Sequence, residues 1–380
     1  MLRAGTGPAR SILQGLLHSA LSRGMTAERF CQAIVLFFAA LLLATPAVAQ
    51  NAVEEFYRGR QVNLIVGYGP GGGYDTAARL LARHLGRFLP GNPTIVTQNM
   101  PGAGSMRAAS YLYSVAPRDG GTFGLFGSDI PLIALIANNR NAPLDPRSFT
   151  WIGSSSSFAG DAYILLVRPG APTRSIAEAR RPGASPLVLA GTGEGARDGD
   201  VPKILRDSLG LNIRQVLGYT DTPSICLAIE RGEVDGRMFD FSYVKSSKPR
   251  WLEPTSGFDI LLQFARTARH PQLPRVPTAR ELVSSEAARA LIELSEAPLL
   301  HMARPFAAPP AIPSERAQAL RSAFAAVHRD PAFLAEAEKL GIDISPVSAH
   351  DLLSAIERMA HGSPEAFGYM SRLLAAHRGG

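Results

Sequence analysis

The chain has 380 residues, with 39 lysines and arginines against 32 aspartates and glutamates, and its formal net charge is +7. No basic stripe with interleaved aromatic residues occurs, so the sequence predicts no binding of nucleic acid. Once an N-terminal leader is removed, about 330 residues remain, which exceeds the 250–300 residues at which a single core stops growing. The length therefore favours two lobes.

The N-terminus has the pattern of an export signal. Residues 33–44 are all apolar or small, and this segment is too short to span a bilayer, which needs about 20 residues. Ala47-Val48-Ala49 has the small-x-small form of a signal peptidase site. We therefore expect residues 1–49 to be cleaved near Ala49–Gln50 and the mature protein to be periplasmic. The leader is long, which makes Met25 a candidate translation start.

The next segment predicts a strand, a glycine turn and a helix. An apolar run at 62–68 breaks into Gly69-Pro70-Gly71-Gly72-Gly73, and an amphipathic run follows over 76–89. The first amides of a helix that opens from such a turn can bind an anion, because they have no intrahelical partner and the helix dipole is positive there. The same design recurs at 99–113 and 187–205. Three such turns indicate a protein that holds a small anion by its backbone.

Strand and helix patterns alternate through the first two thirds of the chain. Strands are predicted at 62–67, 94–98, 122–127, 162–167, 187–190, 213–217 and 234–239, with helices between several of them at 76–89, 105–115, 200–209 and 223–232. This alternation predicts an α/β fold with mostly parallel sheets flanked by helices. After Leu262 the pattern changes to helices at 278–296, 314–328, 331–340 and 349–360.

Two proline-bearing loops mark the expected lobe boundaries. They lie at 141–149 and 248–257. Accordingly, residues 51–149 and 258–380 form the predicted first lobe, and residues 150–257 form the second. The chain would cross twice between the lobes.

The first glycine turn offers several binding candidates. Gly71, Gly72 and Gly73 allow a ligand to approach the backbone. Asp75 lies near the helix start, where its carboxylate either caps amides of the same turn or contacts a ligand amine or hydroxyl. Tyr74 either stacks on a ligand or covers the pocket rim.

The third turn, residues 191–197, mixes small and charged residues. Thr192 offers a hydroxyl, and Gly193 an amide. Arg197 either pairs with a ligand carboxylate or is a solvated loop charge paired with Asp198 or Asp200. Glu194 either points outward or meets a cationic part of the ligand, because an unpaired carboxylate in an anion pocket is costly.

The signals for enzymes, cofactors and metals are weak. The chain has no GxSxG elbow and no Walker dipeptide, and Ser242–Lys245 matches SxxK without the companion motifs. GAGSMR at 102–107 lacks the third glycine of a dinucleotide fingerprint. The histidines are scattered, without metal-ligand spacing. We therefore expect no catalytic residue, no cofactor and no metal, and we interpret Cys226 as a buried, inert thiol.

The order of motifs resembles one family along the whole mature chain. The blocks are GPGGGYDTAARLLA, NMPGAGSMRAA, APRDGGTFGLFGSD, the AGTGEG turn, VLGYTDTPSICLAIERGEVDG and the tail from PFAAPPAIP to LGIDISP. Together they are similar to the periplasmic substrate-binding receptors of tripartite tricarboxylate transporters, called Bug-type receptors.

This resemblance implies a two-lobed binding protein of type II-like architecture that closes over one ligand in the cleft. Carried to this sequence, the first-lobe contacts would come from Tyr68, Gly71, Gly72, Gly73, Tyr74, Asp75, Ala103, Gly104 and Ser128. The opposite wall would come from Thr192, Gly193, Glu194 and Tyr219, with Asp240 or Phe241 at the following strand end. Tyr74, Phe158, Tyr163 and Phe239 would favour an aromatic or flat carboxylate.

The partners implied by the resemblance are a small organic anion and a two-component membrane permease, and we expect the receptor to be a monomer. Two alternatives remain open at this stage. One is an exported binding protein that feeds a signalling partner, and the other is a secreted hydrolase. The hydrolase is the weaker, because no nucleophile–base pair is visible.

Overall fold

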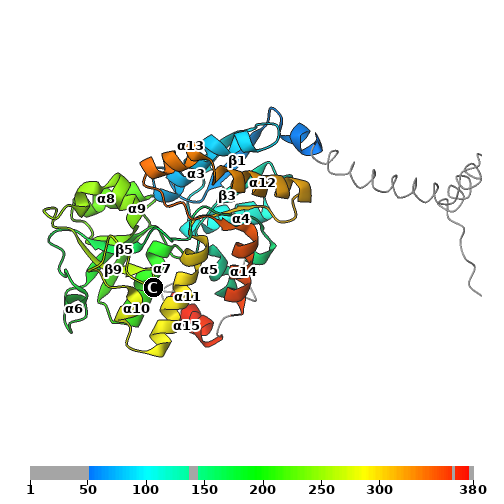
Figure 1. The fold of residues 1–380 in the computed structure, drawn as a ribbon. Coiled ribbons are helices and arrows are strands. Elements are labelled where there is room, and N and C mark those ends of the chain that lie inside the picture. The colour runs from blue at the N-terminus through cyan, green and yellow to red at the C-terminus, as the bar shows by residue number, and fades with distance from the viewer. Residues whose placement is uncertain (1–50, 137–143, 362–363, 376–380) are drawn as a thin grey trace, which may run out of the picture. The chain divides into compact units, whose positions relative to one another are not determined.

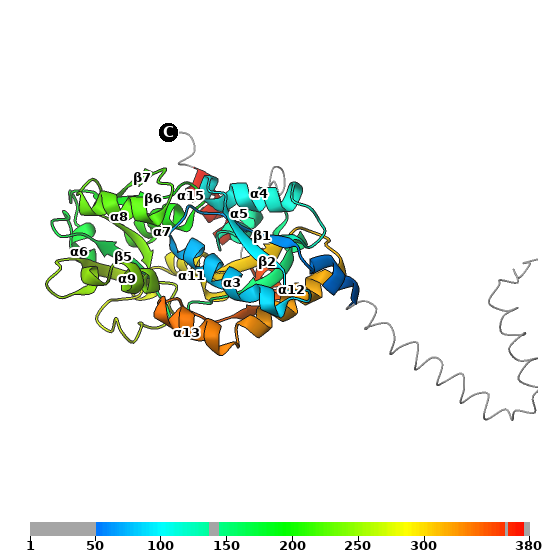
Figure 2. The same ribbon diagram turned by 90° about the horizontal axis from the view of Figure 1, so that it is seen from above.

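Two β-sheets organise the chain. The computed structural model describes residues 51–136, 144–361 and 364–375, so the predicted signal peptide lies outside the described residues. Its contacts divide the chain into residues 1–55 and 56–380, and the description below concerns the second unit. Figures 1 and 2 show the two sheets side by side within this unit, each with its own helices.

The first sheet has the strand order β11-β4-β10-β3-β1-β2. β1 runs parallel to β2 and β3, whereas β10 is antiparallel to β3 and β4, and β11 is antiparallel to β4. The strands are β1 (Gln61–Val66), β2 (Thr94–Asn99), β3 (Thr122–Leu125), β4 (Thr150–Ser154), β10 (Pro305–Ala308) and β11 (Val347–Ser348).

The second sheet has the order β7-β6-β8-β5-β9. β6 is parallel to β7 and β8, and β5 is antiparallel to β8 and β9. The strands are β5 (Tyr163–Val167), β6 (Leu187–Gly191), β7 (Ile213–Leu217), β8 (Gly236–Asp240) and β9 (Asp259–Phe264). Both sheets are therefore mixed, which corrects the prediction of mostly parallel sheets, while the two-sheet α/β architecture is confirmed.

The antiparallel pairs arise where the chain crosses between the sheets. β4 belongs to the first sheet although it follows the first proline loop, and β9 belongs to the second sheet although it follows the second loop. Strand membership thus favours lobe boundaries that lie after β4 and after β9. We propose these boundaries in place of the predicted ones at 149/150 and 257/258.

Helices cover the sheets and begin close to the predicted positions. The long predicted helix at 278–296 is divided in two, because Thr278 caps one helix and Ser285 caps the next. The helices are α3 (Gly73–Leu85), α4 (Met106–Ser114), α5 (Ile130–Ile136), α6 (Ile176–Ala179), α7 (Arg197–Leu209), α8 (Thr222–Glu230), α9 (Phe241–Ser247), α10 (Ala279–Leu282), α11 (Glu286–Met302), α12 (Ser314–Val327), α13 (Pro331–Lys339), α14 (Ala349–Ala360) and α15 (Pro364–Ala375).

Each of the three predicted glycine turns is followed by a helix, as the sequence predicts. α3 and α7 follow the first and third turns directly, and α4 follows the second through a short 3-10 turn. Gly104 in the second turn has φ of +58°, and a Cβ there would lie 2.4 Å from the amide nitrogen of Ala196. Glycine is required at this position, because the second and third turns meet backbone to backbone.

Other sequence features are also found in the described part of the chain. Asp330 accepts a hydrogen bond from the amide of Phe333 at the start of α13, with Pro331 in the first turn. Cys226 is buried, and burial raises the pKa of its thiol. Across residues 51–136, 144–361 and 364–375, no helix has the length and apolarity needed to cross a membrane.

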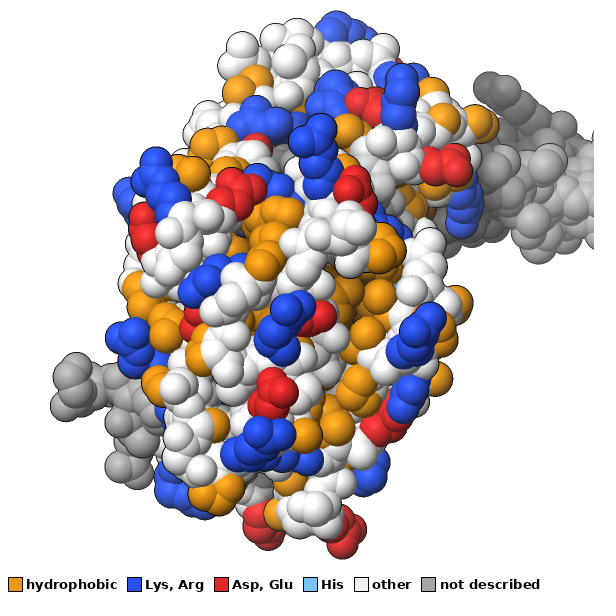
Figure 3. All heavy atoms as spheres, turned by 90° about the vertical axis from the view of Figure 1, so that its left-hand side faces the viewer, with side chains coloured by type: hydrophobic (Ala, Val, Ile, Leu, Met, Phe, Trp, Pro, Cys, Tyr) orange, Lys and Arg blue, Asp and Glu red, His pale blue; other side chains and the backbone are white. Residues whose placement is uncertain are grey.

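The face that carries α6, α8 and α9 has a mixed surface. Figure 3 shows Lys and Arg side chains dispersed there among acidic and apolar ones. Such dispersion differs from the contiguous basic patch that recognises nucleic acid.

His328 supplies a pH-dependent contribution to stability. It is buried, its Nδ1 lies 2.7 Å from the carbonyl oxygen of Phe324, and its Nε2 lies 2.8 Å from Oγ of Ser155. Burial lowers the pKa of His328 to about 4, from an ordinary value of 6.5. The unfolded chain therefore binds a proton between these pH values that the folded chain does not, and stability falls as the pH drops through this window.

We expect the wild type to lose up to about 3 kcal/mol more unfolding free energy than His328→Gln when the pH falls from 6.5 to 4. Urea unfolding at several pH values measures this difference. Parallel curves for the two proteins would contradict the prediction. His350→Gln, at an exposed histidine, is the matched control.

Candidate functional site

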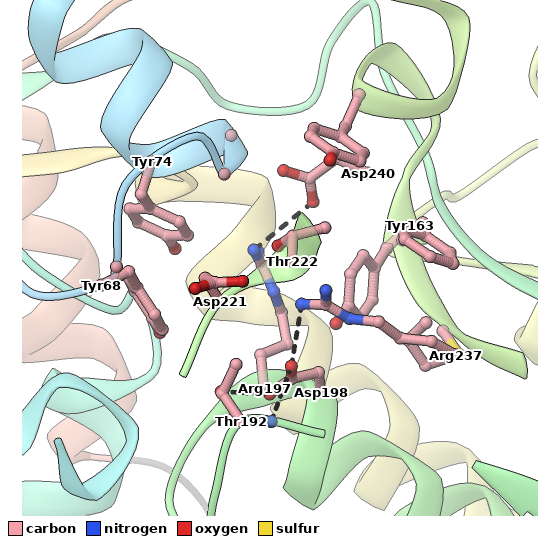
Figure 4. Close-up of a pocket in the computed structure, with 16 residues that line it drawn as sticks. Tyr68, Tyr74, Tyr163, Thr192, Arg197, Asp198, Asp221, Thr222, Arg237 and Asp240 are labelled. Carbon is pink, nitrogen blue, oxygen red and sulfur yellow. Dashed lines mark hydrogen bonds and ion pairs between the residues drawn. The ribbon is translucent and has the colours of Figure 1, made fainter. Parts of the chain in front are cut away.

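A pocket lies where the first glycine turn meets elements of the second sheet. It has an empty volume of about 560 Å³, part of which is open to solvent. Figure 4 shows its charged and aromatic side chains pointing toward one another. The lining residues are Tyr68, Gly69, Gly72, Gly73, Tyr74, Tyr163, Thr192, Arg197, Asp198, Asp221, Thr222, Arg237, Met238, Phe239, Asp240 and Tyr243.

Arg197, the first residue of α7, reaches across the pocket. Its Nη2 lies 3.5 Å from Oδ1 of Asp240, and its Nη1 lies 3.4 Å from Oγ of Ser128. Its guanidinium carbon lies 4.5 Å from the centroid of the Tyr163 ring and 5.8 Å from that of Tyr74. Arg197 is thus buried between both lobes and faces the pocket, so it is not a solvated loop charge.

Arg237 extends from β8 into the same pocket. Its Nη2 donates to Oδ2 of Asp198 at 2.8 Å. Asp198 also accepts from the amide of Thr192 at 3.0 Å and from its hydroxyl at 2.8 Å. Asp198 is therefore satisfied by the protein itself, and it holds Arg237 in place.

Asp240 lies at the end of β8, opposite the start of α3. Its Oδ2 lies 3.4 Å from Nη2 of Arg304. A Cβ on Gly73 would lie 3.4 Å from the same oxygen. The carboxylate of Asp240 therefore faces the first turn of α3, between the guanidinium groups of Arg197 and Arg304.

Arg197, Arg237 and Arg304 each have buried side-chain nitrogens without a hydrogen-bond partner. Among the residues that the structure describes, the buried side-chain nitrogens without a partner are Nε of Arg197, Nε and Nη1 of Arg237, and Nε and Nη1 of Arg304. Leaving a buried charged donor unpaired is costly. An acceptor-rich group that enters here would relieve this cost.

The tyrosines of the pocket are neutral phenols. Burial raises the pKa of Tyr68, Tyr74 and Tyr163 above the ordinary value of 10. The Tyr74 hydroxyl donates to the carbonyl oxygen of Ala303 at 3.1 Å and accepts from the amide of Ser128 at 3.2 Å. Tyr74 is therefore fixed as a wall of the pocket.

Six of the predicted site residues line this pocket, namely Tyr68, Gly72, Gly73, Tyr74, Thr192 and Asp240. Three others, Ala103, Gly104 and Tyr219, line an adjoining cavity that shares Tyr68 and Thr192. Ser128 lines a further cavity that shares Arg197. The assignment of these residues to ligand binding remains a prediction.

Four predicted site residues line none of these three cavities: Gly71, Asp75, Gly193 and Glu194. Asp75 instead accepts from the amide of Gly71 at 2.9 Å and from Nε of Arg79 at 2.8 Å, so it caps its own turn. Glu194 pairs with Lys203, whose side chain is 1% exposed. This pairing removes Glu194 from the pocket, as in the outward-pointing alternative.

Sequence reasoning missed Arg237, Asp198 and Arg304 as site residues. One signal was available for Arg237, because it is a charged residue inside the predicted strand at 234–239. Arg304 gave no signal, since the strand β10 that follows it was not predicted. Phe158, expected in the ligand wall, is buried and lies 5.6 Å from Arg197 by its ring centroid.

Comparison with known proteins identifies the fold and the relatives. No family model matches the chain. A UPF0065 protein of Bordetella pertussis is 26% identical over 323 residues, which is 84% of this chain and 90% of the relative. Protein BugT of the same organism is 37% identical over 92 residues, which is 24% of this chain and 27% of BugT.

Three solved structures share the fold. The periplasmic binding protein BugD has a TM-score of 0.65 and 20% identity, covering 83% of this chain and 98% of BugD. The predicted resemblance to the Bug-type receptors is confirmed. A protein of R. palustris solved with adipate has a TM-score of 0.62 and 21% identity, covering 83% and 98% of the two chains. MatC from Rhodopseudomonas palustris, solved with bound malate, has a TM-score of 0.59 and 19% identity, covering 83% and 99%.

The Bug-type fold explains the position of the pocket. Ligand sites of two-lobed proteins occur preferentially between the lobes, and the pocket here joins the start of α3 to the ends of β6 and β8. Of these neighbours, BugD is named as a periplasmic binding protein, and MatC was solved with bound malate. The two-lobed α/β fold of periplasmic binding proteins is likewise confirmed.

Proposed function

We propose that this chain is a periplasmic receptor that captures a small organic carboxylate. The observation that carries the proposal is the set of unpartnered guanidinium nitrogens of Arg197 and Arg237 at the interlobe pocket. Arginine binds carboxylates through two parallel N–H donors, and the strength of such bonds increases away from water. Adipate and malate in two proteins of the same fold support the same chemistry.

The pocket also supports an apolar or flat ligand body. Tyr74, Tyr163, Phe239 and Tyr243 line it. Aromatic walls with a few polar anchors are typical of small-molecule sites. This composition favours a carboxylate with a flat or apolar remainder.

The delivery step follows from the same proposal. A ligand that contacts both lobes binds the closed form better than the open form, and so shifts the population toward closure. We propose that the closed receptor delivers its ligand to a two-component membrane permease of the tripartite tricarboxylate type. The Bug-type resemblance supports this partner.

A thermal-shift and calorimetric screen of the mature chain tests the carboxylate proposal. The panel contains short aliphatic and aromatic mono- and dicarboxylates, with the corresponding primary amides as uncharged controls. A bound carboxylate at a hundredfold excess over its dissociation constant should add about 2.7 kcal/mol to the unfolding free energy. Absence of a shift with every carboxylate of the panel would exclude the proposed function.

A further inference from the structure

We propose that the pocket selects ligands with a single carboxylate over dicarboxylates, because Asp240 supplies the second carboxylate itself. This inference rests on the proposed function and specifies the ligand class of the same site. The ligand would have one anionic end and an uncharged remainder. Asp240 would be the specificity-determining residue.

The first step of the argument is the position of Asp240. Its Oδ2 faces the first turn of α3, at the place where a Cβ on Gly73 would come within 3.4 Å. The start of a helix stabilises a negative charge through its free amides and its dipole. In this chain the carboxylate of Asp240 lies beside this turn, so a ligand carboxylate placed at the turn would meet a like charge.

The second step is the balance of buried charge. Three guanidinium groups, those of Arg197, Arg237 and Arg304, face the two carboxylates of Asp198 and Asp240. Among the groups joined by these three ion pairs, one ligand carboxylate makes the numbers of positive and negative charges equal. A second one would be a buried charge without a partner, which proteins tolerate only at high cost.

The third step concerns three further carboxyl groups near the pocket, which disfavour a second negative charge on the ligand. Burial, together with the adjacent charge of Asp240, raises the pKa of Asp161 to about 6. Burial also raises the pKa of Asp129 to about 6. Asp221 lines the pocket and caps α8 through the amide of Ser224 at 2.8 Å. Of these carboxylates only Asp221 lines the pocket, so it faces the second charge of a dianion most directly, together with Asp240.

The anchor left for the ligand is Arg237. Asp240 engages Arg197 and Arg304, and Arg304 does not line the pocket. Arg237 lines the pocket, is not paired with Asp240 and has two unpartnered nitrogens after its bond to Asp198. Figure 4 shows the guanidinium groups of Arg237 and Arg197 converging on the same space. A single carboxylate placed there would accept from Arg237 and leave the Asp240 end to a neutral group.

The test uses matched pairs of ligands that differ in one charge. Adipate, succinate and terephthalate are each compared with their monomethyl esters, which keep every oxygen atom but carry one carboxylate. Calorimetry on the mature chain measures each dissociation constant. We expect the monoesters to bind at least about tenfold more tightly, a difference of about 1.4 kcal/mol.

The outcomes separate this inference from the proposed function. If the dicarboxylates bind as tightly as the monoesters or more tightly, the inference is wrong while the carboxylate receptor stands. If no carboxylate of either panel binds, both proposals fail.

An Asp240 variant tests whether this residue causes the preference for ligands with one carboxylate. In Asp240→Asn the preference for the monoesters should shrink by about tenfold, because like charges brought together at an interface are strongly unfavourable. Asp240 makes no side-chain cap to α9, so the substitution removes no helix cap. Asp259→Asn, at the surface pair with Arg174, is the control and should leave the preference unchanged. An unchanged preference in Asp240→Asn would overturn the role of this residue, and the wild-type comparison tests the selectivity even if the variant does not fold.

Discussion

Replacing Arg237 with glutamine is expected to raise the dissociation constant of a carboxylate ligand at least about 30-fold, because truncating one partner of a buried charge pair costs 2–5 kcal/mol. Arg237 is buried, lines the pocket and has two nitrogens without a protein partner. The substitution removes these donors from the position where the ligand carboxylate would lie. Calorimetric titration with the best carboxylate of the screen measures the change.

Two further variants make this result specific. Arg168→Gln is the matched control, because Arg168 is also a second-lobe arginine and pairs with Asp235 at 2.8 Å, but does not line the pocket. It should bind with an unchanged dissociation constant. Arg237→Lys keeps the charge but loses the planar fork, so its affinity should lie between those of wild type and Arg237→Gln. A folded Arg237→Gln protein with wild-type affinity would show that the ligand is anchored elsewhere.

The largest loss of stability is expected from Arg280→Ala. Arg280 donates to Oε2 of Glu296 at 2.5 Å, and the Glu296 side chain is 0% exposed. Oε1 of Glu296 accepts from the amide of Ala265 at 2.9 Å, so Glu296 joins α11 to the end of β9. Removing Arg280 leaves a buried carboxylate without its partner, which should lower the unfolding free energy by about 3–5 kcal/mol. Urea unfolding measures the change.

The pH dependence of this loss provides an internal check. Burial raises the pKa of Glu296, and Arg280 partly offsets that increase. Without Arg280 the pKa should rise further, so the folded variant binds a proton at a higher pH than the unfolded chain does. The deficit of Arg280→Ala should therefore shrink as the pH falls toward the ordinary pKa of glutamate.

Arg269→Ala is the control for the stability measurement. Arg269 pairs with Glu281, and the two side chains are 41% and 40% exposed. Exposed pairs contribute about 0–1 kcal/mol. Equal losses for Arg280→Ala and Arg269→Ala would show that burial of Glu296 carries no penalty.

Sequence patterns located most of the parallel strands and the helices, because burial on both faces leaves continuous apolar runs and amphipathic helices have a clear period. The run LVLAG of β6, which is parallel to β7 and β8, is an example, and all of it except Val188 is buried. The sequence patterns did not predict β4, β9, β10 and the two-residue strand β11. All four lie in antiparallel pairs, and β10 and β11 are short, with four and two residues.

The site was predicted in part for a similar reason. Gly72, Gly73 and Thr192 belong to loops whose composition shows that the backbone must be approached closely. Arg304 and Arg237 each stand alone in the sequence, outside any motif. The residues next to them in the sequence do not indicate that the two side chains lie close together in the fold. For Arg197 the sequence predicts either a pair with a ligand carboxylate or a solvated pair with Asp198 or Asp200, whereas in the structure its guanidinium group pairs with Asp240.

The sequence alone determined the glycine turns, the helices that they open and the resemblance to Bug-type receptors, because these depend on local backbone geometry and on the order of motifs. The tertiary structure alone decided which charges meet. Arg197, Arg237, Arg304, Asp198 and Asp240 come from separate elements, and their pairing depends on how two sheets with crossing chains bring those elements together. Coulomb interactions between residues distant in sequence have no local pattern, so the electrostatics of the pocket are visible only in the fold.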